Sequence, residues 1–182
     1  MEWRLNHVGQ MAQSVQDYSK YREYQGEIDF LTGVMGRRLF LQHCQNIQSD
    51  QRIHGHQGWF LFLDVDWFKQ INDKLGHIAG DETLKKFAMF LKGQFEPYGA
   101  VGRVGGDEFA VMIEEEMSQE ALEEEMKQFF QNISGIQKEV TVSCSIGVYR
   151  FKYPKTIKEL LTKTDEILYE AKANGRGCFV IR

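Results

Sequence analysis

The stretch VGRVGGDEFAVMI, residues 101–113, places two adjacent glycines and two acids between two apolar runs. Short apolar runs on either side of a glycine turn predict a β-hairpin, with strands over Ala100–Val104 and Glu108–Ile113. We expect the glycine pair to supply the positive φ values of a tight turn. Asp107 and Glu108 leave the turn as neighbours, so their side chains should point to opposite faces. The chain must therefore fold into a sheet whose turn carries bare carboxylates.

Helix and strand patterns alternate along the rest of the chain. The expected elements, in chain order, are a helix over Arg37–Ser49, a strand over Trp59–Asp66, a helix over Ile78–Phe95, the hairpin, a helix capped by Ser118, an alternating strand over Val140–Val148, a helix over Thr156–Ala173 and a strand over Cys178–Ile181. Without the first helix, this order is β-α-β-β-α-β followed by α-β. We therefore predict an α+β fold with a ferredoxin-like split β-α-β core and an additional α-β extension. Its central, mostly antiparallel sheet should be flanked by helices.

Length and composition suit one domain of 182 residues, 42% of them hydrophobic, which can bury a substantial core. The net charge is −4 and no basic stripe is present, which argues against nucleic-acid binding. The longest apolar run, Trp59–Leu63, is too short to cross a bilayer, and no secretory signal is apparent, so we expect a cytoplasmic protein without a membrane segment in this chain. Cys44, Cys144 and Cys178 are odd in number and scattered, which favours packing roles over a disulfide or a zinc site.

Residues 1–28 form a leader in front of this pattern. Apolar residues spaced by three, four and three positions lie on one face of an expected leader helix: Val8, Met11, Val15 and Tyr18. Arg22 breaks the pattern before a second heptad is complete. The spacing fits a helix packed on its own domain and a signalling stalk that pairs two protomers equally well. We expect the main domain to span residues 29–182.

A second acidic motif ends the strand before the hairpin. Asp64 and Asp66 are two positions apart, so they share a face if the strand continues. In the split fold this strand lies beside the hairpin, which allows one acid from each motif to converge. Two carboxylates about 4 Å apart at an effective dielectric of about 20 repel by roughly 4 kcal/mol, so a cation must neutralise them. Few hard oxygen ligands favour magnesium. Taken alone, each motif fits a solvated turn or strand end better than a site.

Five ordered blocks of the chain resemble the GGDEF domain family, the diguanylate cyclases. The central block is Gly105-Gly106-Asp107-Glu108-Phe109. The others are DFLTGVMGRR (residues 29–38), DVDWFKQINDKLGHIAGD (64–81), VTVSCSIGV (140–148) and TDEILYEAKANGR (164–176). The resemblance covers the chain from about Asp29 to its end.

This resemblance implies condensation of two GTP molecules into cyclic di-GMP with release of two pyrophosphates, one GTP being held by each protomer of a homodimer. Asp64 and Asp107 would bind Mg²⁺ or Mn²⁺, two ions per active site, with the Val65 carbonyl and Glu108 as further ligands. Such a site neutralises charge while a 3′-hydroxyl attacks an α-phosphate. Asp107, with Glu108 beside it, would be catalytic, either as a general base or as a ligand that keeps the 3′-oxygen deprotonated.

The resemblance also implies a substrate site. Asn72 and Asp81 match the guanine-reading positions, and an amide with a carboxylate suits the guanine edge, so ATP should be rejected. Gly80 should let the base approach the backbone closely. Lys172 and Arg176 match the positions that hold the terminal phosphates.

Two features of the chain qualify the phosphate site. Gly175 is expected to end the last helix before Arg176, so the two cations need not share a helix face. The backbone N–H groups of Trp67, Phe68 and Lys69, in the turn after the first strand, offer a nest that could cradle phosphate.

The sequence departs from the family pattern at several positions. Many members carry an R-x-x-D product-inhibition site ending five residues before the glycine pair, where this chain has Glu96-Pro97-Tyr98-Gly99. We therefore expect no feedback inhibition through that site. Gly36 and Gly177 stand where the family often has asparagine, which affects local turn geometry.

Two other functions share part of this pattern. A GGDEF regulatory module could bind GTP without turnover, although the intact candidate residues argue against it. A template-directed polymerase palm shares the metal chemistry but needs thumb and finger domains and a basic channel, which this length and charge exclude. A symmetric product requires two sites facing each other, so the leader could bring protomers together under an upstream sensor domain.

Overall fold

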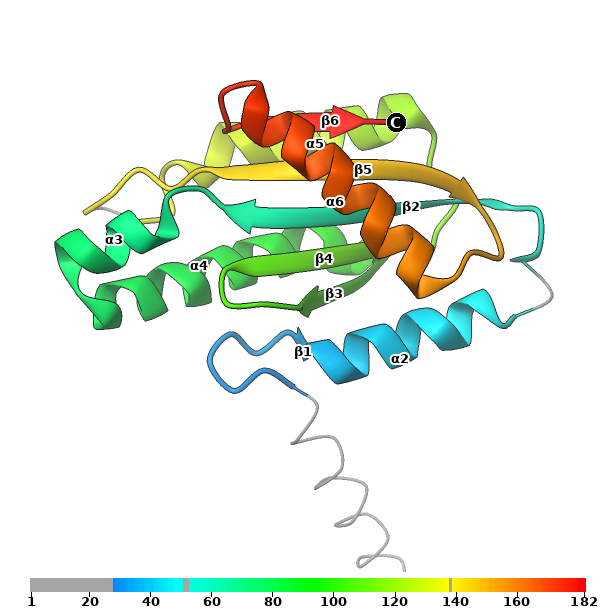
Figure 1. Ribbon diagram of the computed structural model, residues 1–182, viewed down its shortest axis with the longest axis horizontal. Helices are drawn as coiled ribbons and strands as arrows, with labels where there is room; N and C mark the ends of the chain where they lie inside the picture. The colour runs from blue at the N-terminus through cyan, green and yellow to red at the C-terminus, as the bar shows by residue number, and fades with distance from the viewer. Residues whose placement is uncertain (1–27, 51–52, 138) are drawn as a thin grey trace, which may run out of the picture.

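The computed structural model describes residues 28–50, 53–137 and 139–182 (Figure 1). The expected leader helix and its apolar seam lie outside these residues. The elements, in chain order, are β1 (Met35–Gly36), α2 (Arg37–Gln48), β2 (Gln57–Val65), α3 (Phe68–Leu75), α4 (His77–Phe95), the short 3-10 helix η2 (Glu96–Tyr98), β3 (Gly99–Arg103), β4 (Glu108–Ile113), α5 (Gln119–Ile133), β5 (Cys144–Lys152), α6 (Ile157–Ala173) and β6 (Phe179–Ile181). Within the described residues, no helix combines the length and apolar character needed to cross a membrane.

The strands form one mixed sheet in the order β1-β3-β4-β2-β5-β6. The β3–β4, β4–β2 and β2–β5 pairs are antiparallel, whereas β1–β3 and β5–β6 are parallel. The four central strands are those of the predicted split β-α-β core, and α6 with β6 adds the predicted extension at one edge. The predicted fold class is therefore confirmed. The two-residue strand β1, which extends the sheet at the other edge, was not predicted.

Helices cover both faces of the sheet because β2 is apolar on both of its faces. Trp59, Leu61 and Leu63 pack with α4 and α5, while Phe60 and Phe62 pack with α2 and α6. In Figure 1, α6 crosses in front of the strands, and α4 and α5 lie behind them. This alternation places the even-numbered positions of β2 on the α6 side of the sheet.

Side chains at the helix starts explain two of the boundaries. The Ser118 hydroxyl accepts a hydrogen bond from the Ala121 N–H and caps α5, as predicted. Thr156 and Glu159 form a reciprocal capping box at the start of α6. Gly36 caps α2 without a side-chain hydrogen bond, which an asparagine at this position could have supplied.

Two sequence predictions about local structure were wrong. The segment expected to turn after β2 forms α3, which buries Ile71 and ends just before Gly76, where φ is +82°. The strand expected from Val140 begins only at Cys144, because Cys144 pairs with Val65 and β2 offers no partner beyond that residue. The three cysteines are free, as expected, and Cys44 and Cys144 are buried in the core.

Candidate active site

The two acidic motifs meet at the carboxyl end of β2. The antiparallel register of β2 and β4 places Asp64 directly opposite Glu108. One residue further, the Val65 N–H donates a hydrogen bond of 3.1 Å to the Asp107 carbonyl oxygen. The predicted convergence is therefore confirmed for the backbone, and the turn between β3 and β4 lies against the end of the central strand.

The glycine pair makes this turn in a different way from the one predicted. Neither Gly105 nor Gly106 has a positive φ. The Val104 and Gly105 N–H groups both donate to the Glu108 carbonyl, at 2.9 and 3.2 Å, so the turn is wider than a two-residue hairpin turn and needs no left-handed residue. Gly105 instead leaves room for Glu108, because a Cβ there would lie 2.1 Å from Glu108 Oε2 and would displace this carboxylate.

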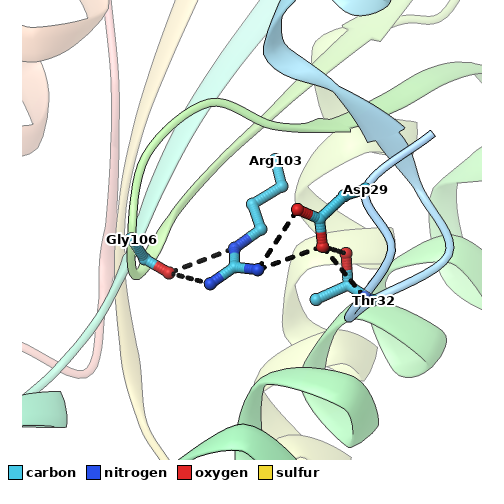
Figure 2. Close-up of polar contacts among 4 residues, drawn as sticks. All are labelled: Asp29, Thr32, Arg103 and Gly106. Carbon is cyan, nitrogen blue, oxygen red and sulfur yellow. Dashed lines mark hydrogen bonds and ion pairs between the residues drawn. The ribbon is translucent and has the colours of Figure 1, made fainter. Parts of the chain in front are cut away.

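Arg103, which was not among the predicted site residues, donates hydrogen bonds to the turn between β3 and β4 (Figure 2). The Arg103 Nε and Nη2 atoms donate to the Gly106 carbonyl at 3.1 and 2.7 Å. The Arg103 Nη1 atom lies 3.0 Å from Asp29 Oδ1, which also accepts from the Thr32 N–H and hydroxyl. Burial raises the pKa of Asp29, but the hydrogen bonds from Thr32 and Arg103 outweigh it, so the pKa is lowered. The first residues of the domain are thereby tied to the acidic turn.

A lysine from α6 lies over the paired acids. Lys172 Nζ is 2.9 Å from Asp64 Oδ2. Burial raises the pKa of Asp64; Lys172 lowers it, and the charges of Asp107 and Asp66 raise it further, leaving a net increase. The pKa of Glu108 is also raised, first by burial and then by the charges of Asp64 and Asp107. These carboxyl groups therefore repel one another at the strand end, and a single ammonium group compensates them in part.

Asp66 does not share the surroundings of Asp64, because β2 ends at Val65. Its side chain is only 3% exposed. It accepts hydrogen bonds from the Ser143 and Ser145 hydroxyls, at 3.0 and 2.7 Å, and from the Gly177 N–H, at 2.9 Å. The expectation that both aspartates share one face of a continued strand is therefore wrong. Asp66 ties β2 to β5 and to the loop after α6.

The predicted guanine-reading residues lie on the helix pair α3 and α4. Asn72 is on α3, and its side chain packs against Gly80 of α4, where a Cβ would lie only 1.9 Å from Asn72 Oδ1. Asp81 follows directly and is exposed. A side chain at Gly80 would therefore displace the Asn72 amide, and the close approach of a base to this glycine stays a prediction. Because Gly80 has no side chain, Asn72 can lie next to it, one residue before Asp81.

The predicted phosphate-binding groups lie at the start of α3 and after the end of α6. Phe68 and Lys69 occupy the first turn of α3, whose N–H groups have no acceptor within the helix. Helix α6 ends at Ala173, before Arg176, as predicted. The Arg176 guanidinium carbon lies 4.2 Å from the centroid of the Trp67 ring.

The acids at the carboxyl end of β2 (Asp64, Asp107 and Glu108) form an acidic edge whose chemistry fits a divalent cation. Among residues 28–50, 53–137 and 139–182, no three His, Cys, Asp or Glu side chains are grouped to hold a metal ion. Asp64 and Glu108 are nevertheless half-buried oxygen donors in cross-strand register with raised pKa values, a state that a cation relieves. Magnesium keeps several water ligands and is commonly bound by one or two carboxylates together with substrate phosphates, so two close side chains suffice.

The position of the missing product-inhibition motif is the 3-10 helix η2. The Tyr98 hydroxyl donates a hydrogen bond of 2.8 Å to Glu125 of α5, and Lys92 lies 3.3 Å from Glu96. The segment has neither the arginine nor the aspartate of the family motif. The absence of feedback inhibition through it stays a prediction.

The sequence analysis missed the structural roles of Asp29, Trp67 and Arg103 at this site, and it named Asp66 but placed it on the same face as Asp64. Asp29 and Asp66 belong to blocks that carried the resemblance, but nothing in a linear pattern indicates their distant partners, Arg103 for Asp29 and Ser143 for Asp66, which lie more than 70 positions away. An arginine just before a glycine turn gives no signal of its own. Trp67 was considered only for its backbone N–H.

The fold and the paired acids define a ferredoxin-like domain with an acidic site at the end of its central strand. The family description "Diguanylate cyclase, GGDEF domain" matches residues 27–178. The chain is 31% identical over 172 residues to diguanylate cyclase DgcS of Shewanella oneidensis, a match that covers 93% of this chain and 58% of DgcS. It is 37% identical over 162 residues to the probable diguanylate cyclase DgcI of Escherichia coli, covering 88% of this chain and 34% of DgcI.

A solved structure of a GGDEF domain is also similar to this chain. The GGDEF domain of TpbB from Pseudomonas aeruginosa superposes with a TM-score of 0.76 at 32% identity, covering 85% of this chain and 93% of that one. This protein belongs to the GGDEF domain family. The chain spans 58% of DgcS and 34% of DgcI, so the relatives contain further sequence beyond the shared domain.

Proposed function

We propose that this protein is a diguanylate cyclase, which condenses two GTP molecules into cyclic di-GMP and releases two pyrophosphates. The observation that carries the proposal is the cross-strand register of Asp64 and Glu108, with the Asp107 backbone bonded to the end of the same strand. This register gathers acids from two distant motifs at the carboxyl end of the central strand β2. GTP is a cytoplasmic nucleotide, and the domain would work in that compartment.

Asp64, Asp107, Glu108 and the Val65 carbonyl would hold Mg²⁺ or Mn²⁺, with two ions in the proposed site. When bound, the ions neutralise charge on the attacking and leaving oxygens of the phosphoryl transfer. Asp107 lies at the turn and would accept the proton of the 3′-hydroxyl or help to keep that oxygen deprotonated. The raised pKa values of Asp64 and Glu108 support a role for both as cation ligands, because a cation favours their charged forms.

The helix pair α3 and α4 would read the base. Asn72 and Asp81 can donate to and accept from the guanine edge, which adenine does not match. The first-turn N–H groups of Phe68 and Lys69 would bind phosphate oxygens. Lys172 and Arg176 would bind the terminal phosphates, with Lys172 moving between Asp64 and the nucleotide.

A homodimer would complete the reaction. One domain holds one GTP, and a product with two-fold symmetry requires two sites facing each other. The leader, residues 1–28, would bring the protomers together under the control of an upstream sensor.

The test is incubation of the protein with GTP and magnesium, followed by mass detection of cyclic di-GMP. We expect product from the wild type and at least a 100-fold lower rate for Asp107→Asn, in the range found when an electrostatic or acid-base group is lost. Equal product from both would contradict the proposed mechanism. Glu108→Gln should also lose activity, whereas its matched control Glu115→Gln, just beyond the other end of β4, should not.

A regulatory module that binds GTP without turnover is the alternative. It predicts that the wild type retains GTP and rejects ATP while forming no cyclic di-GMP. Calorimetry with both nucleotides, run beside the product assay, separates the two functions.

A further inference from the structure

Trp67 and Arg176 form a stacked pair beside the acidic edge. The guanidinium carbon is 4.2 Å from the centroid of the indole ring, within the range of a favourable cation–π contact. Trp67 is 54% exposed, which is unusual for the largest aromatic side chain. Within the described residues, the Arg176 guanidinium forms no ion pair and donates no hydrogen bond, and it contacts the Trp67 ring.

The backbone is strained at both members of the pair. In the described part of the chain, Trp67 and Arg176 are the two non-glycine residues with positive φ, at 58° and 66°. A bulky residue in this region is unfavourable and persists only where its surroundings impose it, which occurs most often at ligand sites. The coincidence of both outliers in one contact indicates that the contact is built by the fold.

One buried carboxylate imposes this backbone. Asp66 directly precedes Trp67, and its Oδ2 atom accepts a hydrogen bond of 2.9 Å from the N–H of Gly177, which directly follows Arg176. Ser143 and Ser145 hold the same carboxylate from β5. The chain positions of Trp67 and Arg176 are thereby fixed relative to each other through a single side chain.

Lys172 and Arg176, the two cations expected at the phosphate site, differ in their contacts. Lys172 is engaged by Asp64 at 2.9 Å, whereas the donors of Arg176 form no hydrogen bond or ion pair among the residues that the structure describes. Trp67 is also the N-cap residue of α3, so it directly precedes the N–H groups of Phe68 and Lys69. A planar guanidinium with five donors suits a polyphosphate, and a ring face can hold it without using those donors.

We propose that Trp67 is a positioning residue that holds the Arg176 guanidinium, through its ring, ready to bind the terminal phosphates of the nucleotide. This inference rests on the proposed function for the identity of the nucleotide. It assigns to the Trp67 side chain a role in substrate affinity, although the side chain itself needs no contact with the nucleotide.

The test compares Trp67→Asn with Trp67→Phe. Asparagine tolerates positive φ, so Trp67→Asn removes the ring without adding backbone strain, and phenylalanine keeps a ring. We expect Trp67→Asn to raise the KM for GTP roughly 3- to 30-fold with kcat nearly unchanged, which is the range of a cation–π contact. Trp67→Phe should recover part of the loss. Melting temperatures show whether each variant is folded.

A double-mutant cycle separates positioning from a general structural role. If the ring acts through Arg176, Trp67→Asn has no further effect on KM in an Arg176→Ala background, because the guanidinium is already absent. An equal rise in both backgrounds overturns the proposal, as does an unchanged or lowered KM in the single variant. Arg150→Ala is the matched control: it removes a second cation–π contact, 5.1 Å from the Trp59 ring, and should leave KM unchanged.

A binding experiment makes failure of this inference distinguishable from failure of the proposed function. The α,β-methylene analogue of GTP cannot release pyrophosphate, and its binding should change tryptophan emission in the wild type but not in Trp67→Phe. This result supports the inference even if no cyclic di-GMP is formed. Normal cyclisation with unchanged KM in Trp67→Asn overturns the inference and leaves the proposed function intact.

Discussion

Asp29 and Asp66 both connect segments that are far apart in the sequence, and both lie beside the acidic edge, but their surroundings differ. Asp66 is 3% exposed and accepts hydrogen bonds from two hydroxyls and one backbone N–H. Asp29 lies nearer the surface and pairs with the Arg103 guanidinium as well as with Thr32. One carboxylate is thus held by neutral donors in the interior, and the other by a cation at the rim.

The difference has an energetic consequence. Asp66 is almost fully buried and its bond to Ser145 is buried as well, so water can replace only part of the hydrogen-bond energy that is lost when this carboxylate is removed. A pair at the rim is partly screened, and water can take over its hydrogen bonds. We therefore expect Asp66 to determine the stability of the domain and Asp29 to determine the position of the turn more than the stability.

The largest effect should follow from Asp66→Ala. It leaves the Ser145 hydroxyl and the Gly177 N–H without their acceptor, and we expect the free energy of unfolding to fall by about 3 kcal/mol. Urea denaturation measures this change. Ser143→Ala removes one of the three hydrogen bonds and serves as the control, with an expected loss of about 1 kcal/mol. A loss for Asp66→Ala as small as that for Ser143→Ala would show that the buried carboxylate is not the anchor.

A smaller effect is expected for Asp29→Asn, which keeps one acceptor for Thr32 but removes the charge that faces Arg103. The free energy of unfolding should fall by about 1 kcal/mol at neutral pH. The same urea titration measures it. Should Asp29→Asn destabilise the domain as much as Asp66→Ala, the distinction between rim and interior would be lost.

The smallest effect concerns pH. The pKa of Asp29 is lowered in the folded protein by its hydrogen bonds to Thr32 and Arg103, which outweigh burial. Its contribution to stability is therefore present above the unfolded-state pKa of about 3.9 and is lost as the pH falls through the lower folded-state value. The difference in unfolding free energy between the wild type and Asp29→Asn should shrink below about pH 4.

Denaturation at a series of pH values measures this change. Arg103→Gln retains the Thr32 hydrogen bonds and should show part of the same pH dependence. A difference between the wild type and Asp29→Asn that stays constant down to about pH 3 would contradict the assignment of the lowered pKa.

Much of the fold could be predicted from local patterns. The strand alternation, the helix caps at Ser118 and Thr156 and the end of α6 before Arg176 all arise from interactions among residues near in sequence. Helix α3 was missed because eight residues with one buried apolar side chain carry a weak periodic signal. The glycine turn was predicted with the wrong geometry because glycine is used both for positive φ and for close approach, and the sequence does not distinguish these uses.

The sequence by itself determined the order of the elements, the acidic motifs and the family, because hydrophobic period, capping and motif spacing are properties of a linear chain. The tertiary structure alone decided which acid faces which neighbour. Asp64 and Asp66 are two positions apart, yet one meets Lys172 and Glu108 while the other is buried among serines and a backbone N–H. That outcome depends on where β2 ends and on strands and loops more than 40 residues away, whose positions are set by packing of the whole sheet.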